Sequence, residues 1–109
     1  MPPKRYGSVI KVKPEKLDYY KALHADPWPQ VLATITASNI RNYTIYLRDG
    51  YLFSHYEYWG DDFEADMKKM AADPVTQKWW EETGPCQEPI ATAKEGEWWA
   101  RMEEVFHHD

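Results

Sequence analysis

The chain has 109 residues, with 13 Lys or Arg against 18 Asp or Glu, so its formal net charge is -5. This length predicts one domain spanning residues 1–109. The acidic balance argues against nucleic acid and against anionic membranes as partners, because both require a basic surface. Aromatic residues make up 16% of the chain, more than a small core can hide, so we expect some of them to line a pocket or an interface.

The sequence also limits the compartment and the redox chemistry. Cys86 is the only cysteine, which excludes an intrachain disulfide and a cysteine-based zinc site, and we expect a structural, unreactive thiol. The first residues lack the apolar run of a signal peptide, and no stretch approaches membrane-spanning length. A cytoplasmic protein is therefore expected.

The first part of the chain predicts a strand followed by a broken helix. Residues 6–12 alternate as a strand does. Pro14 then begins a helix, because a proline in the first turn loses no hydrogen bond there. Residues 26–27 (Asp-Pro) interrupt the helix, since the residue before a proline is pushed away from helical angles. Residues 28–38, which open with Trp-Pro, continue as a second helical segment with an apolar face.

A hairpin and a second broken helix are predicted next. Residues 40–47 and 51–59 are two strand-like runs joined by a tight Arg-Asp-Gly turn. Asp61 is expected to cap the following helix, with Glu64 in the capping-box position. The Asp-Pro pair at residues 73–74 breaks that helix and begins a short one that carries two adjacent tryptophans.

The end of the chain is predicted to be a long loop, residues 83–96, and a last strand, residues 102–107. The resulting order βαββαβ predicts an α+β fold of the ferredoxin-like type. Its sheet has helices on one face only, so the other face must be covered. We therefore expect a homodimer, with two sheets packed against each other as a dimeric α/β barrel.

A group of aromatic side chains and one histidine is the most informative feature of the chain. Tyr20 and His24 lie one turn apart on the first helix, Tyr43 lies on the second strand, and Trp79 and Trp80 are adjacent on a helix. Histidine exchanges protons near neutral pH, while phenols and indoles offer flat faces and one polar group each. The pattern indicates proton transfer on a small, uncharged molecule rich in hydroxyl groups, such as a sugar.

Each of these residues also has a purely structural interpretation. The imidazole of His24 could lie at the surface near a helix end, and the rings of Tyr20 and Tyr43 could pack in the core and on the sheet. Neighbouring helical side chains point about 100° apart, so we expect one tryptophan to contact the ligand, Trp79 being favoured, and the other to join the core.

No metal or cofactor is expected. His55, His107 and His108 lack the ligand spacing of a metal site, and no motif supports one. The acidic clusters at residues 61–62 and 81–82 are interpreted as solvated helix ends.

The chain resembles the L-rhamnose mutarotases. The resemblance rests on segments that follow one another in the same order over nearly the whole chain: Tyr20-x-x-x-His24, Trp28-Pro29, residues 41–47, residues 77–80 and residues 102–106. Known members are small cytoplasmic ferredoxin-like proteins that dimerise through their sheets. They interconvert the α and β anomers of L-rhamnose without a cofactor.

The resemblance implies roles for particular residues. His24 matches the acid/base histidine of the family, and Tyr20, Tyr43 and the Trp79-Trp80 pair match groups that hold the sugar. General acid–base help of this kind contributes about 10²–10⁴-fold, enough for a reaction that already proceeds slowly in water.

Two departures from the family pattern leave the sugar open between L-rhamnose and a related 6-deoxyhexose such as L-fucose. Gln30 replaces the glutamate that commonly follows the Trp-Pro pair, and residues 83–99 differ from the best-known bacterial member. Two other functions remain possible at this stage. They are a ferredoxin-like dimeric monooxygenase or isomerase acting on an aromatic substrate, and a non-catalytic sugar-binding module.

Overall fold

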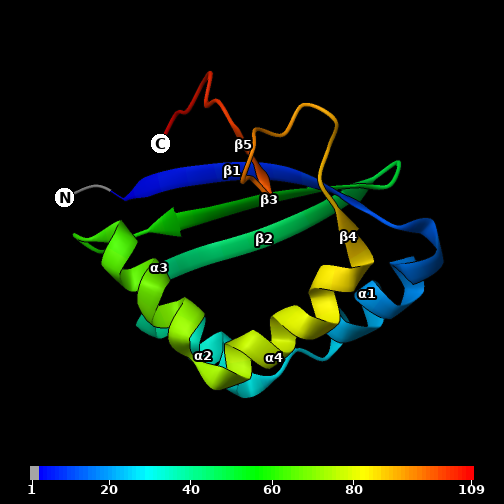
Figure 1. Cartoon of the computed structure of the whole chain (residues 1–109). Helices are drawn as coiled ribbons and strands as arrows, with labels where there is room; N and C mark the ends of the chain where they lie inside the picture. The colour runs from blue at the N-terminus through cyan, green and yellow to red at the C-terminus, as the bar shows by residue number, and fades with distance from the viewer. Residues whose placement is uncertain (1–2) are drawn as a thin grey trace.

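Strands β1 (Lys4–Val12) and β3 (Tyr51–Tyr58) form the middle of a curved antiparallel sheet (Figure 1), in a computed structural model that describes residues 3–109. Strand β2 (Ile40–Arg48) pairs with the free side of β3, so the order across the sheet is β2-β3-β1-β4. Two short strands, β4 (Gln87–Glu88) and β5 (Ala100–Met102), share the outer edge of β1.

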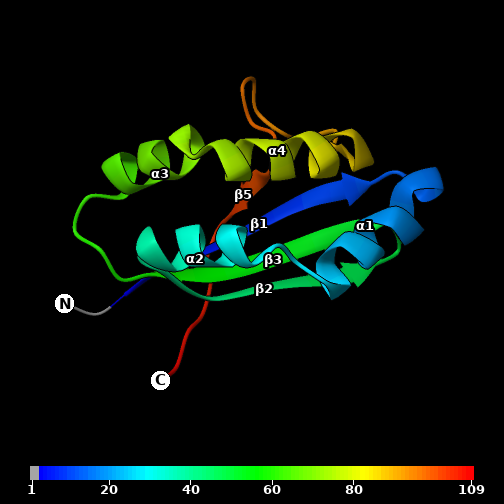
Figure 2. The ribbon, with the colours of Figure 1, turned by 90° about the horizontal axis from the view of Figure 1, so that it is seen from below.

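The helical segments form one layer over a single face of this sheet, as Figure 2 shows from below. They are the 3-10 turn η1 (Pro14–Lys16), α1 (Leu17–Ala25), α2 (Pro29–Ala37), α3 (Phe63–Ala72), α4 (Pro74–Thr83) and the 3-10 turn η2 (Gly84–Cys86). The predicted α+β, ferredoxin-like order is confirmed. Among residues 3–109, no helix is long and apolar enough to cross a membrane.

Strand alternation decides which side chains meet the helices. Ile10 of β1 pairs with Leu52 of β3, and both face the helical layer, where they are 0% and 2% exposed. Tyr20 of α1 packs into the same apolar cluster. Burying one large aliphatic side chain of this kind contributes about 1.5–3 kcal/mol, so this cluster anchors α1 to the sheet.

A bulge in β2 changes the alternation within that strand. Ile40 pairs with Tyr58 and Ile45 pairs with Ser54, so both face the helices although their separation of five residues would put them on opposite faces of a regular strand. Asn42, with φ of 53°, supplies the extra residue, and the register shifts between Arg41 and Thr44. The bulge places Tyr43 on the helix-covered face.

Prolines and aspartates begin and end the helices largely where the sequence predicts. Pro29 and Pro74 occupy first-turn positions. The expected cap at Asp61 is wrong, because the side chain of Asp62 accepts the hydrogen bond from Ala65 N at 3.1 Å. The helix therefore begins at Phe63, one residue later than predicted, and the ring of Phe63 is stacked on that of Tyr6 with 4.7 Å between ring centroids.

The end of the chain also differs from the prediction. Strand β5 stops at Met102, and residues 103–109 are not in a strand. Val105 and Phe106 are 86% and 80% exposed. They are adjacent and lie between two glutamates and two histidines. In a continued strand they would point to opposite faces, each beside polar neighbours, so neither face would be apolar. The predicted loop 83–96 contains β4, which pairs with the end of β1.

Candidate active site

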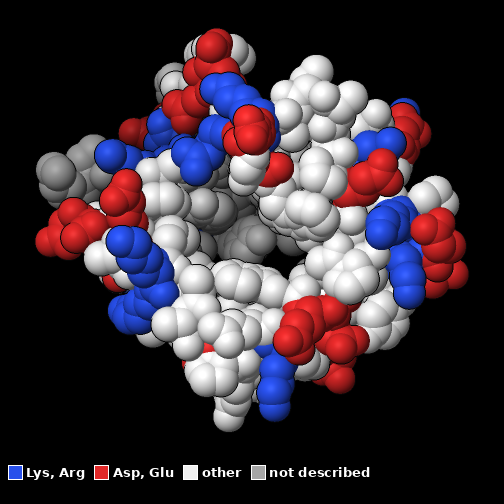
Figure 3. Space-filling view, in the orientation of Figure 1, with Lys and Arg blue, Asp and Glu red and all other residues white. Residues whose placement is uncertain are grey.

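A cavity of about 490 Å³ lies between the concave face of the sheet and the helices. In Figure 3 it is the hollow at the centre of the molecule, with uncharged residues around it and the charged side chains mostly towards the outside. Its volume is within the range of small-molecule sites. Rings dominate the lining: Tyr20, His24, Tyr43, Tyr56, Trp79, Trp80, Trp98 and Trp99.

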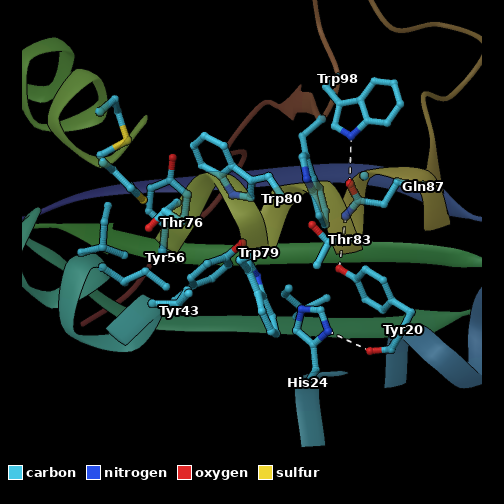
Figure 4. Close-up of a pocket in the computed structure, with 18 residues that line it drawn as sticks. Tyr20, His24, Tyr43, Tyr56, Thr76, Trp79, Trp80, Thr83, Gln87 and Trp98 are labelled. Atoms are coloured by element: carbon cyan, nitrogen blue, oxygen red, sulfur yellow. Dashed lines mark hydrogen bonds between the residues drawn. The ribbon is translucent and has the colours of Figure 1, made fainter. Parts of the chain in front are cut away.

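His24 enters the cavity from the last turn of α1 with its imidazole in a defined orientation (Figure 4). Its Nδ1 lies 2.9 Å from the backbone carbonyl oxygen of Tyr20, one helical turn earlier. A carbonyl oxygen only accepts hydrogen bonds, so the neutral ring carries its proton on Nδ1. The Nε2 lone pair is therefore free to accept a proton from a molecule in the cavity.

Two aromatic rings hold the imidazole in place. The ring of Tyr20 is stacked on that of His24, with centroids 4.3 Å apart and planes 26° apart. Trp79 meets His24 edge-on at 5.2 Å, and Trp28 packs against the other side of Trp79 at the same centroid distance. The imidazole thus loses little orientational freedom when a ligand binds, which favours catalysis.

The hydroxyl group of Tyr20 is buried and stays protonated over a wide pH range. The residue is 4% exposed, and burial raises the pKa of Tyr20 to about 12, although a hydrogen bond from Gln87 works in the opposite direction. Gln87 Nε2 lies 3.3 Å from the phenol oxygen. At neutral pH Tyr20 is therefore a hydrogen-bond donor and not a base.

Tyr43 reaches the cavity because it follows the bulge at Asn42. It is 45% exposed, and its ring meets that of Tyr56 edge-on, with centroids 5.6 Å apart. Although the side chain lines an open cavity, the protein atoms around it displace much of its water, and this burial raises the pKa of Tyr43 well above the ordinary tyrosine range. Tyr43 is a second neutral donor on the sheet side.

Trp79 and Trp80 both line the cavity, but in different ways. Trp79 is 7% exposed and packs against the rings around His24, whereas Trp80 is 45% exposed. The sequence favoured Trp79 as the ligand contact and Trp80 as the core residue, but Trp79 is the more buried of the two. Trp80 is the member of the pair that has ring surface available to a ligand.

Some of the lining residues were missed by sequence reasoning. Gln87 lies within the predicted loop, and Trp98 and Trp99 precede β5, where no periodicity marks them. Trp98 Nε1 donates to Gln87 Oε1 at 2.8 Å, which links this segment to Tyr20. The only available signal was the abundance of aromatic residues between the last predicted helix and the last strand.

The remaining titratable residues do not join this cavity. Burial raises the pKa of the Cys86 thiol, which is 1% exposed and packs in the core, consistent with an unreactive cysteine. His55 faces away from the helices, and His107 bonds Asp109 at 2.7 Å in the exposed tail. Across residues 3–109, no group of three or more His, Cys, Asp or Glu side chains is arranged to hold a metal ion.

The fold and the cavity define a small ferredoxin-like protein with an aromatic small-molecule site that contains one histidine. The model of the L-rhamnose mutarotase family matches residues 5–108. The L-rhamnose mutarotase of Oceanobacillus iheyensis is 31% identical over 97% of this chain and 99% of its own length. That of Bacillus subtilis is 33% identical over 75% of this chain and 78% of its own. The chain therefore belongs to the L-rhamnose mutarotase family, carbohydrate isomerases that interconvert anomers.

Solved structures agree on the fold. The crystal structure of the L-rhamnose mutarotase of Formosa agariphila matches with a TM-score of 0.74 and 19% identity, over 97% of this chain and 99% of that one. Tetracenomycin F2 cyclase of Streptomyces glaucescens, a type-II polyketide cyclase, matches with a TM-score of 0.66 and 16% identity over 97% of each chain. One architecture thus serves different chemistry, and the family assignment rests on the sequence matches.

Proposed function

We propose that the protein interconverts the α and β anomers of L-rhamnose, or of a closely related 6-deoxyhexose, with His24 as the catalytic residue and no cofactor. The observation that carries the proposal is the hydrogen bond from His24 Nδ1 to Tyr20 O, which leaves Nε2 as a base beside a buried phenol. The uncharged aromatic lining suits a neutral sugar, whose C–H faces pack on indole and phenol rings.

In the proposed reaction, Nε2 of His24 takes the proton of the anomeric hydroxyl while the C1–O1 bond becomes a carbonyl and the C1–O5 ring bond breaks. The phenol of Tyr20 donates its proton to the ring oxygen as that oxygen acquires alkoxide character. A phenol with a pKa of about 12 is a stronger acid than an alcohol, so this transfer is downhill. Rotation about C1–C2 and the reverse steps close the ring on the other face of the aldehyde.

The other rings bind and orient the sugar in this proposal. Trp80 offers exposed ring surface for stacking, and Tyr43 donates a hydrogen bond from the sheet side. Trp79 holds the imidazole and contacts the sugar with its remaining accessible edge. In the proposed mutarotation these rings only bind and orient the sugar, and the reaction needs no oxidant, unlike that of a monooxygenase.

The experiment is exchange NMR on L-rhamnose, in which saturation of one anomeric proton signal is followed to the other with and without protein. We expect catalytic amounts to accelerate exchange, with L-fucose slower and D-glucose near the buffer rate. The result should be unchanged by a chelator. Binding of L-rhamnose without any acceleration would instead support the sugar-binding module, and loss of exchange with the chelator would contradict the cofactor-free mechanism.

We also propose a homodimer in which the open sheet faces of two chains pack together as a dimeric barrel. Tyr46 and Phe53 pair across β2 and β3 on the face away from the helices and are 66% and 36% exposed. Val105 and Phe106, in the tail that follows β5, are further exposed apolar side chains. Stable dimers usually bury more than about 1,000 Å² in total, so no marginal equilibrium is expected.

Sedimentation tests the dimer. Wild-type protein should sediment as a dimer at micromolar concentration, and Phe53→Glu should shift it to a monomer, because a charge is then buried in the apolar contact. Leu32→Glu, at a residue that is 48% exposed on the helical layer, is the matched control and should stay dimeric. A monomeric wild type would refute the proposal.

We further propose a cytoplasmic location, which cell fractionation would test.

A further inference from the structure

A chain of hydrogen bonds connects the segment before β5 to the phenol of Tyr20. Trp98 Nε1 donates to Gln87 Oε1 at 2.8 Å, and Gln87 Nε2 donates to Tyr20 Oη at 3.3 Å, as the dashed lines in Figure 4 show. Gln87 is 6% exposed and Tyr20 is 4% exposed, whereas Trp98, at the outer end of the chain, is 46% exposed. The bond between Gln87 and Tyr20 therefore lies away from bulk water, where the direction of a hydrogen bond matters most.

The direction of every bond in this chain follows from the chemistry of its members. An indole N–H only donates, so Gln87 must turn its Oε1 towards Trp98. The amide then presents its NH2 group to Tyr20, and an NH2 group cannot accept a hydrogen bond. The phenol oxygen of Tyr20 must accept from Gln87, and its own hydrogen has to point elsewhere.

Within residues 3–109, that hydroxyl hydrogen meets no protein acceptor. Tyr20 lines the cavity beside His24, so a sugar oxygen is the acceptor it is left to find. The opposite arrangement, in which Tyr20 donates to the amide oxygen of Gln87, would use up the hydrogen and leave none for the sugar.

The backbone holds Gln87 in place for this task. Gln87 pairs with Val12 at the end of β1, and the preceding carbonyl, of Cys86, accepts from Lys13 N at 2.8 Å. The residue thus sits on a paired backbone on the sheet edge and not on a free loop, although it lies next to the long segment 89–99. The side chain of Trp98 then closes over the amide from that segment.

We propose that Gln87, oriented by Trp98, is a positioning residue that directs the O–H bond of Tyr20 at the sugar. The inference rests on the proposed mutarotase function and deepens it, because it says how the acid of that reaction is kept available. It assigns a role to Trp98 that does not depend on contact between its ring and the sugar.

The test reverses or frees the hydrogen bond without removing Tyr20. Gln87→Glu, measured at pH 8, gives the ionised side chain two acceptors, so the phenol donates to the carboxylate and not to the sugar. Trp98→Phe keeps an aromatic ring but removes the donor that fixes the amide, so the amide can turn over. We expect each change to lower the rate constant of L-rhamnose exchange about tenfold or more, with the loss of about 10²-fold expected for Tyr20→Phe, which removes the acid, as the upper limit.

The decisive readout is a pair of double-mutant cycles. If Gln87 and Trp98 act through Tyr20, each substitution should cost less than about twofold when added to Tyr20→Phe. Equal losses in both backgrounds would overturn the inference, because they would show a structural role or direct contact with the sugar. Glu88→Gln makes the reverse exchange of acid and amide at the neighbouring exposed residue and should leave the rate unchanged.

Failure of the inference is distinguishable from failure of the proposed function. If the wild type accelerates exchange and neither substitution changes the rate, the mutarotase function is retained and the positioning role is rejected. If the wild type does not accelerate exchange, the same double-mutant cycles are measured with the dissociation constant for L-rhamnose, obtained by NMR titration. The substitutions at Gln87 and Trp98 should then still cost less binding when they are added to Tyr20→Phe. Amide spectra with the dispersion of the wild type confirm that each variant is folded.

Discussion

The bulge in β2 provides the sharpest test of how the sheet presents its part of the site. Asn42 has φ of 53° there, and Asp49 in the hairpin turn has the same value. A β-branched residue with such a φ costs about 1–2 kcal/mol, whereas glycine adopts it freely. We therefore expect Asn42→Val to be about 1–2 kcal/mol less stable than Asn42→Gly, a comparison in which both variants lack the asparagine side chain.

Urea unfolding at a fixed protein concentration measures this difference. With a slope of about 2 kcal/mol/M, the midpoint of Asn42→Val should lie about 0.5–1 M below that of Asn42→Gly. The same pair of substitutions at Asp49 should give a similar difference in stability, because the backbone conformation is the same.

Valine substitutions at Asn42 and Asp49 should have different effects on the rate of L-rhamnose exchange. Valine favours a regular strand at residue 42, which would turn Tyr43 away from the cavity, so we expect L-rhamnose exchange to fall about tenfold or more. Asp49→Val lies outside the cavity and should exchange at the wild-type rate. Equal stability and equal activity of Asn42→Val and Asn42→Gly would refute the argument that the backbone conformation at Asn42 directs Tyr43.

Two further predictions concern the pocket. Exchange above the buffer rate should persist at alkaline pH, because burial raises the pKa of Tyr20 to about 12 and the donor is kept. A fall that parallels ordinary tyrosine ionisation near pH 10 would contradict this. Trp80→Ala should mainly raise KM because it removes exposed ring surface, whereas Trp79→Ala should lower the unfolding free energy by about 3–5 kcal/mol in urea, as for a buried tryptophan. Similar stability losses in both variants would contradict this division.

The features that local sequence rules describe were predictable. Prolines 29 and 74 mark where helices begin, and the spacing of Tyr20 and His24 puts both on one face of α1. The strand order follows from the βαββαβ pattern, because the hairpin and the helical crossovers leave few alternatives. These two side chains, one turn apart on one helix, therefore line the same cavity.

The features that depend on long-range pairing were not predictable. The role of Gln87 requires β4 to join the edge of β1, a contact between residues far apart in the sequence. The orientation of Tyr43 depends on a bulge that no residue pattern marked. The last strand was predicted at residues 102–107, whereas β5 is Ala100–Met102. The prediction relied on the apolar residues Val105 and Phe106, which are both exposed in the single chain.

The most direct test of the account is anomer exchange by His24→Ala. Because the imidazole is half-buried and outside the core cluster, the variant should remain folded and still bind L-rhamnose. We predict that its exchange rate falls about 10²-fold or more, the usual effect of losing a general acid–base group. His108→Ala, in the exposed tail, should retain the wild-type rate. Exchange by His24→Ala at the wild-type rate would contradict the central claim and move the acid–base role to another group.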